Sequence, residues 1–290
     1  MILDGTELRE GHASLSEVSL HYVEGGDGPL TVLLHGFPEF WFSWRHQIPA
    51  LAAAGLRVVA PDMRGYNLSS RPQEVAAYGM DRLTRDIREL IAERGGEHAF
   101  LAGHDWGAAV AWQTAMQHPE AVERLAILDV PHPRRFLQGL RTRRQLARSW
   151  YMLVFQLPWL PERLIRARNW QALRDGFERD ARPGAFTPAD IGRYVEAWQQ
   201  PGAATGMLNY YRAISRTSPR SIMSAMKPIQ APTRVIWGER DRYVGAELAE
   251  PDPRDVPHLH DVVRLGASHW VQHDEPGRVS QLLVEFFQPA

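Results

Sequence analysis

The stretch Ala99–Gln117, AFLAGHDWGAAVAWQTAMQ, decides the fold. The apolar run over residues 99–102 predicts a short buried strand, and residues 106–117 predict a helix. Between them, GHDWG has the small-x-nucleophile-x-small pattern of a nucleophile elbow, a sharp turn whose flanking glycines let backbone segments pass closely. The central residue is Asp105. An Asp at this position could simply cap the following helix. The strand before it and the helix after it instead favour a catalytic carboxylate.

The same alternation of strands and helices extends outward from this stretch. Strands alternating with crossover helices indicate a mostly parallel sheet covered by helices on both faces. The predicted strands are 18–23, 31–34, 57–60, 99–102, 125–128, 234–237 and 261–265, and the predicted flanking helices are 44–54, 81–93, 106–117 and 276–287.

One segment interrupts this alternation. Residues 132–218 look helical throughout, hold four of the ten tryptophans and are bounded by prolines. We therefore expect a helical cap (lid) inserted into an α/β core, with the core formed by residues 1–131 and 219–290.

Composition excludes several classes of function. The 290 residues contain no Cys, which removes disulfides, thiolate metal sites and thiol nucleophiles. The 33 basic and 34 acidic residues leave a net charge of −1, whereas a nucleic-acid binder normally has a basic excess. The most apolar run, 150–157, is far shorter than the ~20 residues of a membrane span. With no signal peptide evident, we expect a cytoplasmic monomer or homodimer that binds neither nucleic acid nor membranes.

An aspartate nucleophile restricts the chemistry. A carboxylate is ionised at neutral pH and can attack a saturated carbon without a base, giving an alkyl ester. Epoxides and carbon–halogen bonds are suitable targets, whereas attack on an ester or amide would give a labile anhydride. The segment His35-Gly36-Phe37-Pro38 follows a predicted strand at the oxyanion-hole position. We expect the backbone N–H groups of Phe37 and Trp106 to form that hole, with His35 structural.

The base and its acid partner are expected in the last third of the chain. His269 follows the final strand and is the candidate base. His269 and His273 have the spacing of helical zinc ligands, but Trp270 stands where a Glu is expected and no third ligand is evident, so no metal site is predicted. Asp241, after strand 234–237, completes the order nucleophile, acid, His of α/β-hydrolases. Asp129, after strand 125–128, is the alternative acid.

In combination, these motifs resemble the soluble epoxide hydrolases of the α/β-hydrolase fold over nearly the whole chain. The resemblance implies a mostly parallel sheet of the eight-stranded type. The resemblance implies two cap tyrosines that assist ring opening: Tyr151, before Phe155-Gln156-Leu157-Pro158, and Tyr211, in Asn209-Tyr210-Tyr211-Arg212, where Tyr210 is the competing assignment. The motifs that carry it are HGFPE at 35–39, WR at 44–45, PDMRGY at 61–66, GHDWG at 103–107 and GERD at 238–241.

The resemblance implies hydrolysis of a small apolar epoxide to a vicinal diol without metal or cofactor. Aromatic side chains are expected to contact the substrate: Phe37, Trp106, Trp150, Phe155 and Trp270. The alternative is a haloalkane or haloacid dehalogenase with the same nucleophile. Haloalkane dehalogenases typically carry Asn where Phe37 stands, and fluoroacetate dehalogenases typically carry Arg where Trp106 stands. A non-catalytic binding protein on this fold would be expected to lack Asp105, Asp241 or His269, and all three are present.

Overall fold

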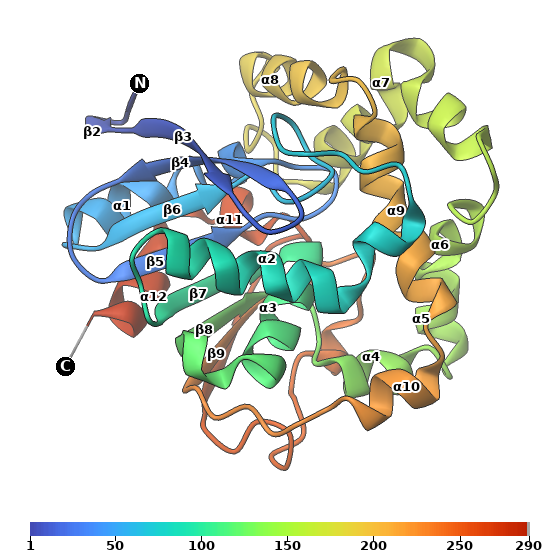
Figure 1. Cartoon of the computed structure of the whole chain (residues 1–290). Coiled ribbons are helices and arrows are strands. Elements are labelled where there is room, and N and C mark those ends of the chain that lie inside the picture. The colour runs from blue at the N-terminus through green and yellow to red at the C-terminus, as the bar shows by residue number, and fades with distance from the viewer. Residues whose placement is uncertain (289–290) are drawn as a thin grey trace.

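The computed structural model describes residues 1–288 and is built around one large sheet (Figure 1). Its eight strands lie in the order β10-β9-β8-β7-β5-β6-β4-β3. β3 and β4 pair antiparallel, as do β4 and β6, and all other pairs are parallel. The strands are β3 (Arg9–Ser14), β4 (Ser19–Gly25), β5 (Leu30–Leu34), β6 (Arg57–Pro61), β7 (Ala99–His104), β8 (Val122–Leu128), β9 (Thr233–Gly238) and β10 (Leu259–Leu265).

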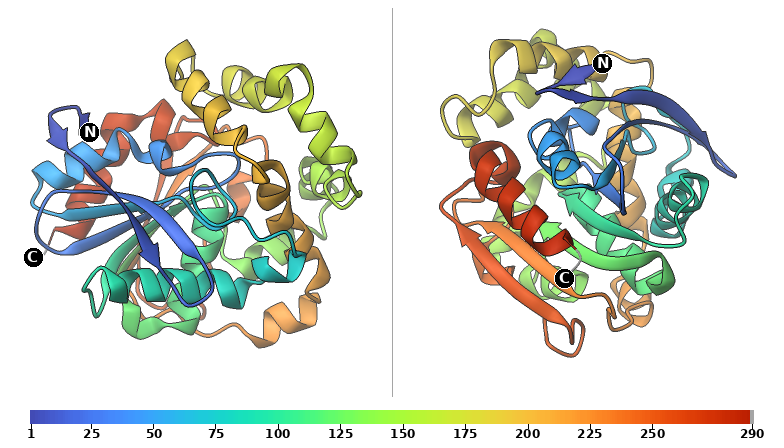
Figure 2. Two further views of the ribbon diagram at one scale, coloured as in Figure 1. Left: turned by 45° about the horizontal axis from the view of Figure 1, so that its top comes forward. Right: turned by 90° about the vertical axis from the view of Figure 1, so that its left-hand side faces the viewer.

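Helices cover both faces of this sheet, as the sequence predicted (Figures 1 and 2). α2 (Met80–Glu93) and α3 (Trp106–Gln117) pack together on one face, and α1 (Gln47–Ala53) and α12 (Pro276–Phe287) pack together on the other. All residues of β5 and β7 are buried, because both faces of these central strands are covered. The fold class is therefore confirmed.

Between β8 and β9 the chain forms only helices, which gather on the side of the molecule away from both labelled ends (Figures 1 and 2). We call them the inserted helices: α4 (Pro133–Gly139), α5 (Arg143–Arg148), α6 (Trp150–Val154), α7 (Leu160–Asp180), α8 (Pro188–Trp198), α9 (Ala203–Arg216) and α10 (Pro219–Ser224). The last of them begins just after the cap boundary predicted at residue 218.

Some elements were not predicted. The edge strand β3 is largely polar and exposed, so its sequence lacks a clear apolar alternation. A separate two-stranded sheet, β1 (Ile2–Leu3) with β2 (Thr6–Glu7), and the four-residue helix α11 (Val271–Asp274) are too short to leave a periodic pattern. Within residues 1–288, no helix combines the length and apolar character needed to cross a membrane.

Candidate active site

Asp105 lies at a sharp turn between the central strand β7 and helix α3. Its backbone has φ 49° and ψ −123°, a conformation that non-glycine residues rarely adopt. A Cβ on Gly103 would collide with the backbone of Gly107, and one on Gly107 would collide with the carbonyl of Leu34. The two glycines therefore permit the close backbone approach that projects the Asp105 carboxylate beyond the carboxyl edge of the sheet.

The loop after β5 supplies a backbone donor to this carboxylate. The Phe37 N–H donates to Asp105 Oδ1 at 2.6 Å. Trp106 is the first residue of α3, where backbone N–H groups have no partner within the helix. The two groups predicted for the oxyanion hole thus lie on the two segments that border Asp105.

His269 and Asp241 come together beside Asp105. His269 Nδ1 lies 2.7 Å from Asp241 Oδ2, and its Nε2 lies 3.7 Å from Asp105 Oδ2. Burial alone would lower the pKa of His269, but the charges of Asp241 and Asp105 outweigh it and raise that pKa well above its usual value. Burial would raise the pKa of Asp105, but the neighbouring His269 and the Phe37 N–H lower it below its usual value.

Asp129, the alternative acid, is buried but does not contact His269 by any hydrogen bond within the described chain. Its Oδ1 accepts the N–H of Gly238 at 2.5 Å, while Oδ2 is buried without a partner. Burial and then the charge of Asp241 raise the pKa of Asp129 well above its usual value. Of the two carboxyls, Asp241 is the one within hydrogen-bonding distance of His269, so the geometry favours Asp241 as its partner.

Aromatic rings from the inserted helices face the nucleophile elbow. The Tyr211 ring packs 5.0 Å from that of Trp106 and 5.4 Å from that of Phe37, and the Tyr151 ring lies 5.8 Å from that of Tyr211. The Phe155 ring packs against the rings of both tyrosines. Burial, and next the charge of Asp105, raise the pKa of both tyrosine hydroxyls, so that both remain proton donors at neutral pH.

The neighbouring residue Tyr210 is engaged elsewhere. Its hydroxyl donates to the carbonyl of Arg64 at 2.7 Å, and its ring packs against Tyr66 and Tyr78. This contact occupies the Tyr210 hydroxyl and supports Tyr211 as the residue that points towards Asp105.

Two of the predicted substrate contacts lie differently from the rest. The Trp150 side chain is 63% exposed, because residues next to each other in a helix point about 100° apart and Tyr151 takes the inward direction. The structure therefore does not bring Trp150 into the group of rings around Asp105. Trp270 is buried against the rings of His269 and Phe177, and its Nε1 donates to the Gly176 carbonyl at 3.2 Å.

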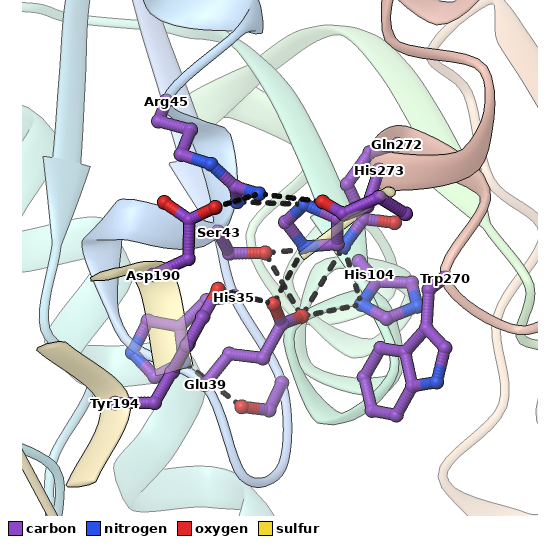
Figure 3. Close-up of polar contacts among 12 residues, drawn as sticks. His35, Glu39, Ser43, Arg45, His104, Asp190, Tyr194, Trp270, Gln272 and His273 are labelled. Atoms are coloured by element: carbon purple, nitrogen blue, oxygen red, sulfur yellow. Dashed lines mark hydrogen bonds and ion pairs between the residues drawn. The ribbon is translucent and has the colours of Figure 1, made fainter. Parts of the chain in front are cut away.

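A buried polar network, which the sequence did not reveal, lies behind the site (Figure 3). Its centre is the Glu39 carboxylate, which accepts hydrogen bonds from Ser43 Oγ at 2.9 Å and from Tyr194 OH, on α8, at 2.8 Å. His273 Nε2 lies 2.7 Å from Glu39 Oε1, and His104 Nδ1 lies 3.2 Å from Oε2. Glu39 stood in the motif at 35–39, but apart from Ser43 its partners come from three distant segments.

The histidines of this network have defined roles. The guanidinium of Arg45 donates to His273 Nδ1 at 2.8 Å, so Nδ1 carries no proton and Nε2 donates to Glu39. Burial lowers the pKa of His273 to about 4, which keeps it neutral. His104 Nε2 lies 2.8 Å from the backbone carbonyl of His269. The network therefore joins helix α8 to the loop that carries His269.

The described residues 1–288 contain no group of three His, Cys, Asp or Glu side chains placed to hold a metal ion. The arrangement around Asp105 is a different one: a carboxylate nucleophile with a backbone donor, a His–Asp pair, and two protonated phenols. It can form an alkyl ester at Asp105 and supply a base for its hydrolysis.

Known proteins are similar to this chain in sequence and in fold. The family model of the alpha/beta hydrolase fold matches residues 29–276. The AB hydrolase superfamily protein YfhM of Bacillus subtilis is 43% identical, with 93% of this chain and 95% of that protein covered. Mouse epoxide hydrolase 3 is 38% identical, with 94% of this chain and 75% of that protein covered. The crystal structure of a Bacillus megaterium epoxide hydrolase with an inhibitor superposes with a TM-score of 0.86 at 33% identity, covering 95% of this chain and 99% of that one. The chain therefore belongs to the alpha/beta hydrolase fold family and, within it, to the epoxide hydrolases.

Proposed function

We propose that this enzyme hydrolyses epoxides to vicinal diols through a covalent alkyl ester on Asp105. The proposal is carried by the placement of Asp105 between two kinds of group. On one side is a His–Asp pair, with His269 Nδ1 2.7 Å from Asp241. On the other are Tyr151 and Tyr211 of the inserted helices. We propose that residues 132–218 form a cap over the site.

In the first step, Asp105 opens the ring. Its Oδ1 accepts the Phe37 N–H, which leaves Oδ2 to attack an epoxide carbon. The carbon–oxygen bond of the epoxide breaks, and the oxygen develops the charge of a strongly basic alkoxide. Tyr151 and Tyr211 hydrogen-bond that oxygen, and one of them supplies the proton. Once the ester has formed, this tyrosine regains a proton through solvent from the imidazolium of His269.

In the second step, His269 directs water to the Cγ of the ester. The ester removes the Asp105 charge that helps to raise the His269 pKa, so alkylation itself shifts His269 towards its neutral, basic form. The oxyanion formed on Oδ1 is stabilised by the N–H groups of Phe37 and Trp106. The bond between Cγ and Oδ2 then breaks, and the diol oxygen takes the proton that His269 received from the water. The second proton of the water, left on the Asp105 carboxyl, passes to His269 and restores the starting charges.

Small apolar epoxides suit the rings that border Asp105, those of Phe37, Trp106 and Phe155. The proposed reaction needs no metal or cofactor, because the nucleophile is already ionised and the acid and base are side chains. The two tyrosines also favour epoxides over halides as substrates. A halide departs as a stable anion, whereas an alkoxide requires the proton that a tyrosine can provide.

A paired assay tests the proposal. Purified protein is given styrene oxide and, separately, a bromoalkane, and diol formation is scored against halide release. We expect diol from the epoxide with much slower halide release. Halide release at a rate that matches or exceeds diol formation would favour the dehalogenase alternative.

A further inference from the structure

Tyr243 is a third tyrosine beside the site, two residues after Asp241. Its backbone N–H and that of Val244 donate to Asp241 Oδ1 at 2.6 and 2.9 Å. The loop that carries Tyr243 therefore also orients the acid. Nothing in the sequence marks this residue, because its side-chain partners lie far away along the chain.

Two of the inserted helices hold this residue in place. At the end of α7, Asp180 accepts hydrogen bonds from Tyr243 OH and from Arg242, each at 2.7 Å. From α5, the buried Gln145 amide donates to the Tyr243 carbonyl at 2.8 Å and accepts the Gly245 N–H at 3.0 Å. The hydroxyl of Tyr243 is thus engaged by Asp180, and its ring is the part of the side chain that can contact a substrate.

The ring packs against two groups that the proposed reaction uses, His269 and Tyr151. Its centroid is 5.1 Å from that of His269, at 66°, and 5.9 Å from that of Tyr151, at 90°. In the proposed reaction Tyr151 contacts the epoxide oxygen and His269 directs water to the ester. A substituent on the epoxide that extends between them therefore meets the Tyr243 ring.

We propose that Tyr243 is a specificity-determining residue whose ring favours epoxides with an aryl substituent, an inference that rests on the proposed epoxide hydrolysis. Aromatic rings attract one another in edge-to-face and offset arrangements beyond the effect of buried area. A planar aryl group can make such a contact with Tyr243, whereas a saturated ring of similar size cannot.

The experiment compares two substrates of similar size, styrene oxide and cyclohexyloxirane, in the native protein and three variants. The measured quantity is the ratio of their kcat/KM values, so a partly misfolded preparation affects both substrates equally. We expect Tyr243→Leu to lower the aryl preference about three- to tenfold relative to native. Tyr243→Phe keeps the ring, and Asp180→Asn leaves it untouched; both should retain the native ratio.

An unchanged ratio in Tyr243→Leu, with diol still formed, would overturn the specificity role and leave the proposed function standing. An equal fall in Tyr243→Phe or Asp180→Asn would also overturn it, because the hydroxyl contact rather than the ring would then set the preference. Native protein that made diol from neither substrate would overturn the proposed function and this inference together.

Discussion

The two sides of the site are built by different means. On the sheet side, Asp105 is held by its own backbone turn and by the Phe37 N–H at 2.6 Å, and His269 is held by Asp241 at 2.7 Å. On the side of the inserted helices, Tyr151 and Tyr211 are placed by ring contacts with centroids 5.8 Å apart. Hydrogen bonds to backbone fix direction closely, whereas ring packing tolerates adjustment. We infer that the sheet side holds the nucleophile and the base in fixed positions, whereas the helical side, which supplies the two phenols, adapts to the substrate.

The strongest test of this division is Asp105→Ala. Removing the nucleophile should lower diol formation by about 10⁴-fold or more, since the groups that remain have nothing to activate. Thermal unfolding of the variant should stay cooperative, which shows that the fold is intact. An Ala variant that still made diol at a substantial rate would contradict the assignment of the elbow.

His269→Gln separates the two steps. Only ester hydrolysis needs the base, so turnover should fall at least about 10³-fold while alkylation continues. The intact protein should then gain the mass of one epoxide, and the modified peptide should contain Asp105. Normal turnover without an adduct would point to another base, although the ring nitrogens of His273 are occupied by Arg45 and Glu39.

The two buried carboxyls near His269 can be compared directly. Asp241→Asn should slow hydrolysis of the ester by about 10²-fold or more, because the imidazolium loses its charged partner. Asp129→Asn serves as the matched control and should change the rate by less than about threefold, because Asp129 accepts the Gly238 N–H rather than contacting His269, and an amide oxygen can accept the same bond. The reverse pattern would move the acid to the end of β8.

The tyrosines test the helical side. Tyr151→Phe and Tyr211→Phe should each lower epoxide turnover by about 10²-fold or less, because either hydroxyl can donate while the other positions the ring. The double Phe variant should be nearly inactive and still folded. Ring opening preserved in the double variant would show that these side chains only pack.

The smallest effect is expected where the two sides join. Glu39→Gln replaces an acceptor of several hydrogen bonds by an amide of equal size and should cost about 1–3 kcal/mol of unfolding free energy. The His273 and His104 side chains outweigh burial and hold the pKa of Glu39 well below its usual value. Its contribution is therefore present above the unfolded pKa of about 4.3 and lost as the pH falls towards the folded value.

Chemical denaturation of native and Glu39→Gln protein at several pH values measures this contribution. The difference in unfolding free energy between the two proteins should shrink on acidification below about pH 4.3. A difference that stayed constant from pH 7 to the acid limit of folding would show that the Glu39 charge does not matter.

The sequence predicted elements with local signals far better than contacts between distant segments. Helix 106–117 and helix 276–287 match the structure at both ends, because each combines local start signals with regular apolar spacing. Tyr243 and Glu39 were missed for the opposite reason. Tyr243 meets Asp180 across 63 positions, and Tyr194 meets Glu39 across 155, so no local pattern records either contact.

The seating of the inserted helices has a consequence for the release of product. Trp198 Nε1 donates to the Pro38 carbonyl at 2.5 Å, and Tyr194 OH donates to Glu39. The Gln145 amide makes hydrogen bonds to the backbone of Tyr243 and Gly245, in the loop after Asp241. A rigid-body rotation of these helices would break buried polar contacts on several sides. Glu39 and the loop after Asp241 would both lose hydrogen-bond partners. Exit of the diol is therefore better served by rotamer changes of individual side chains than by opening of the helices as one domain, a motion of the microsecond-to-millisecond scale.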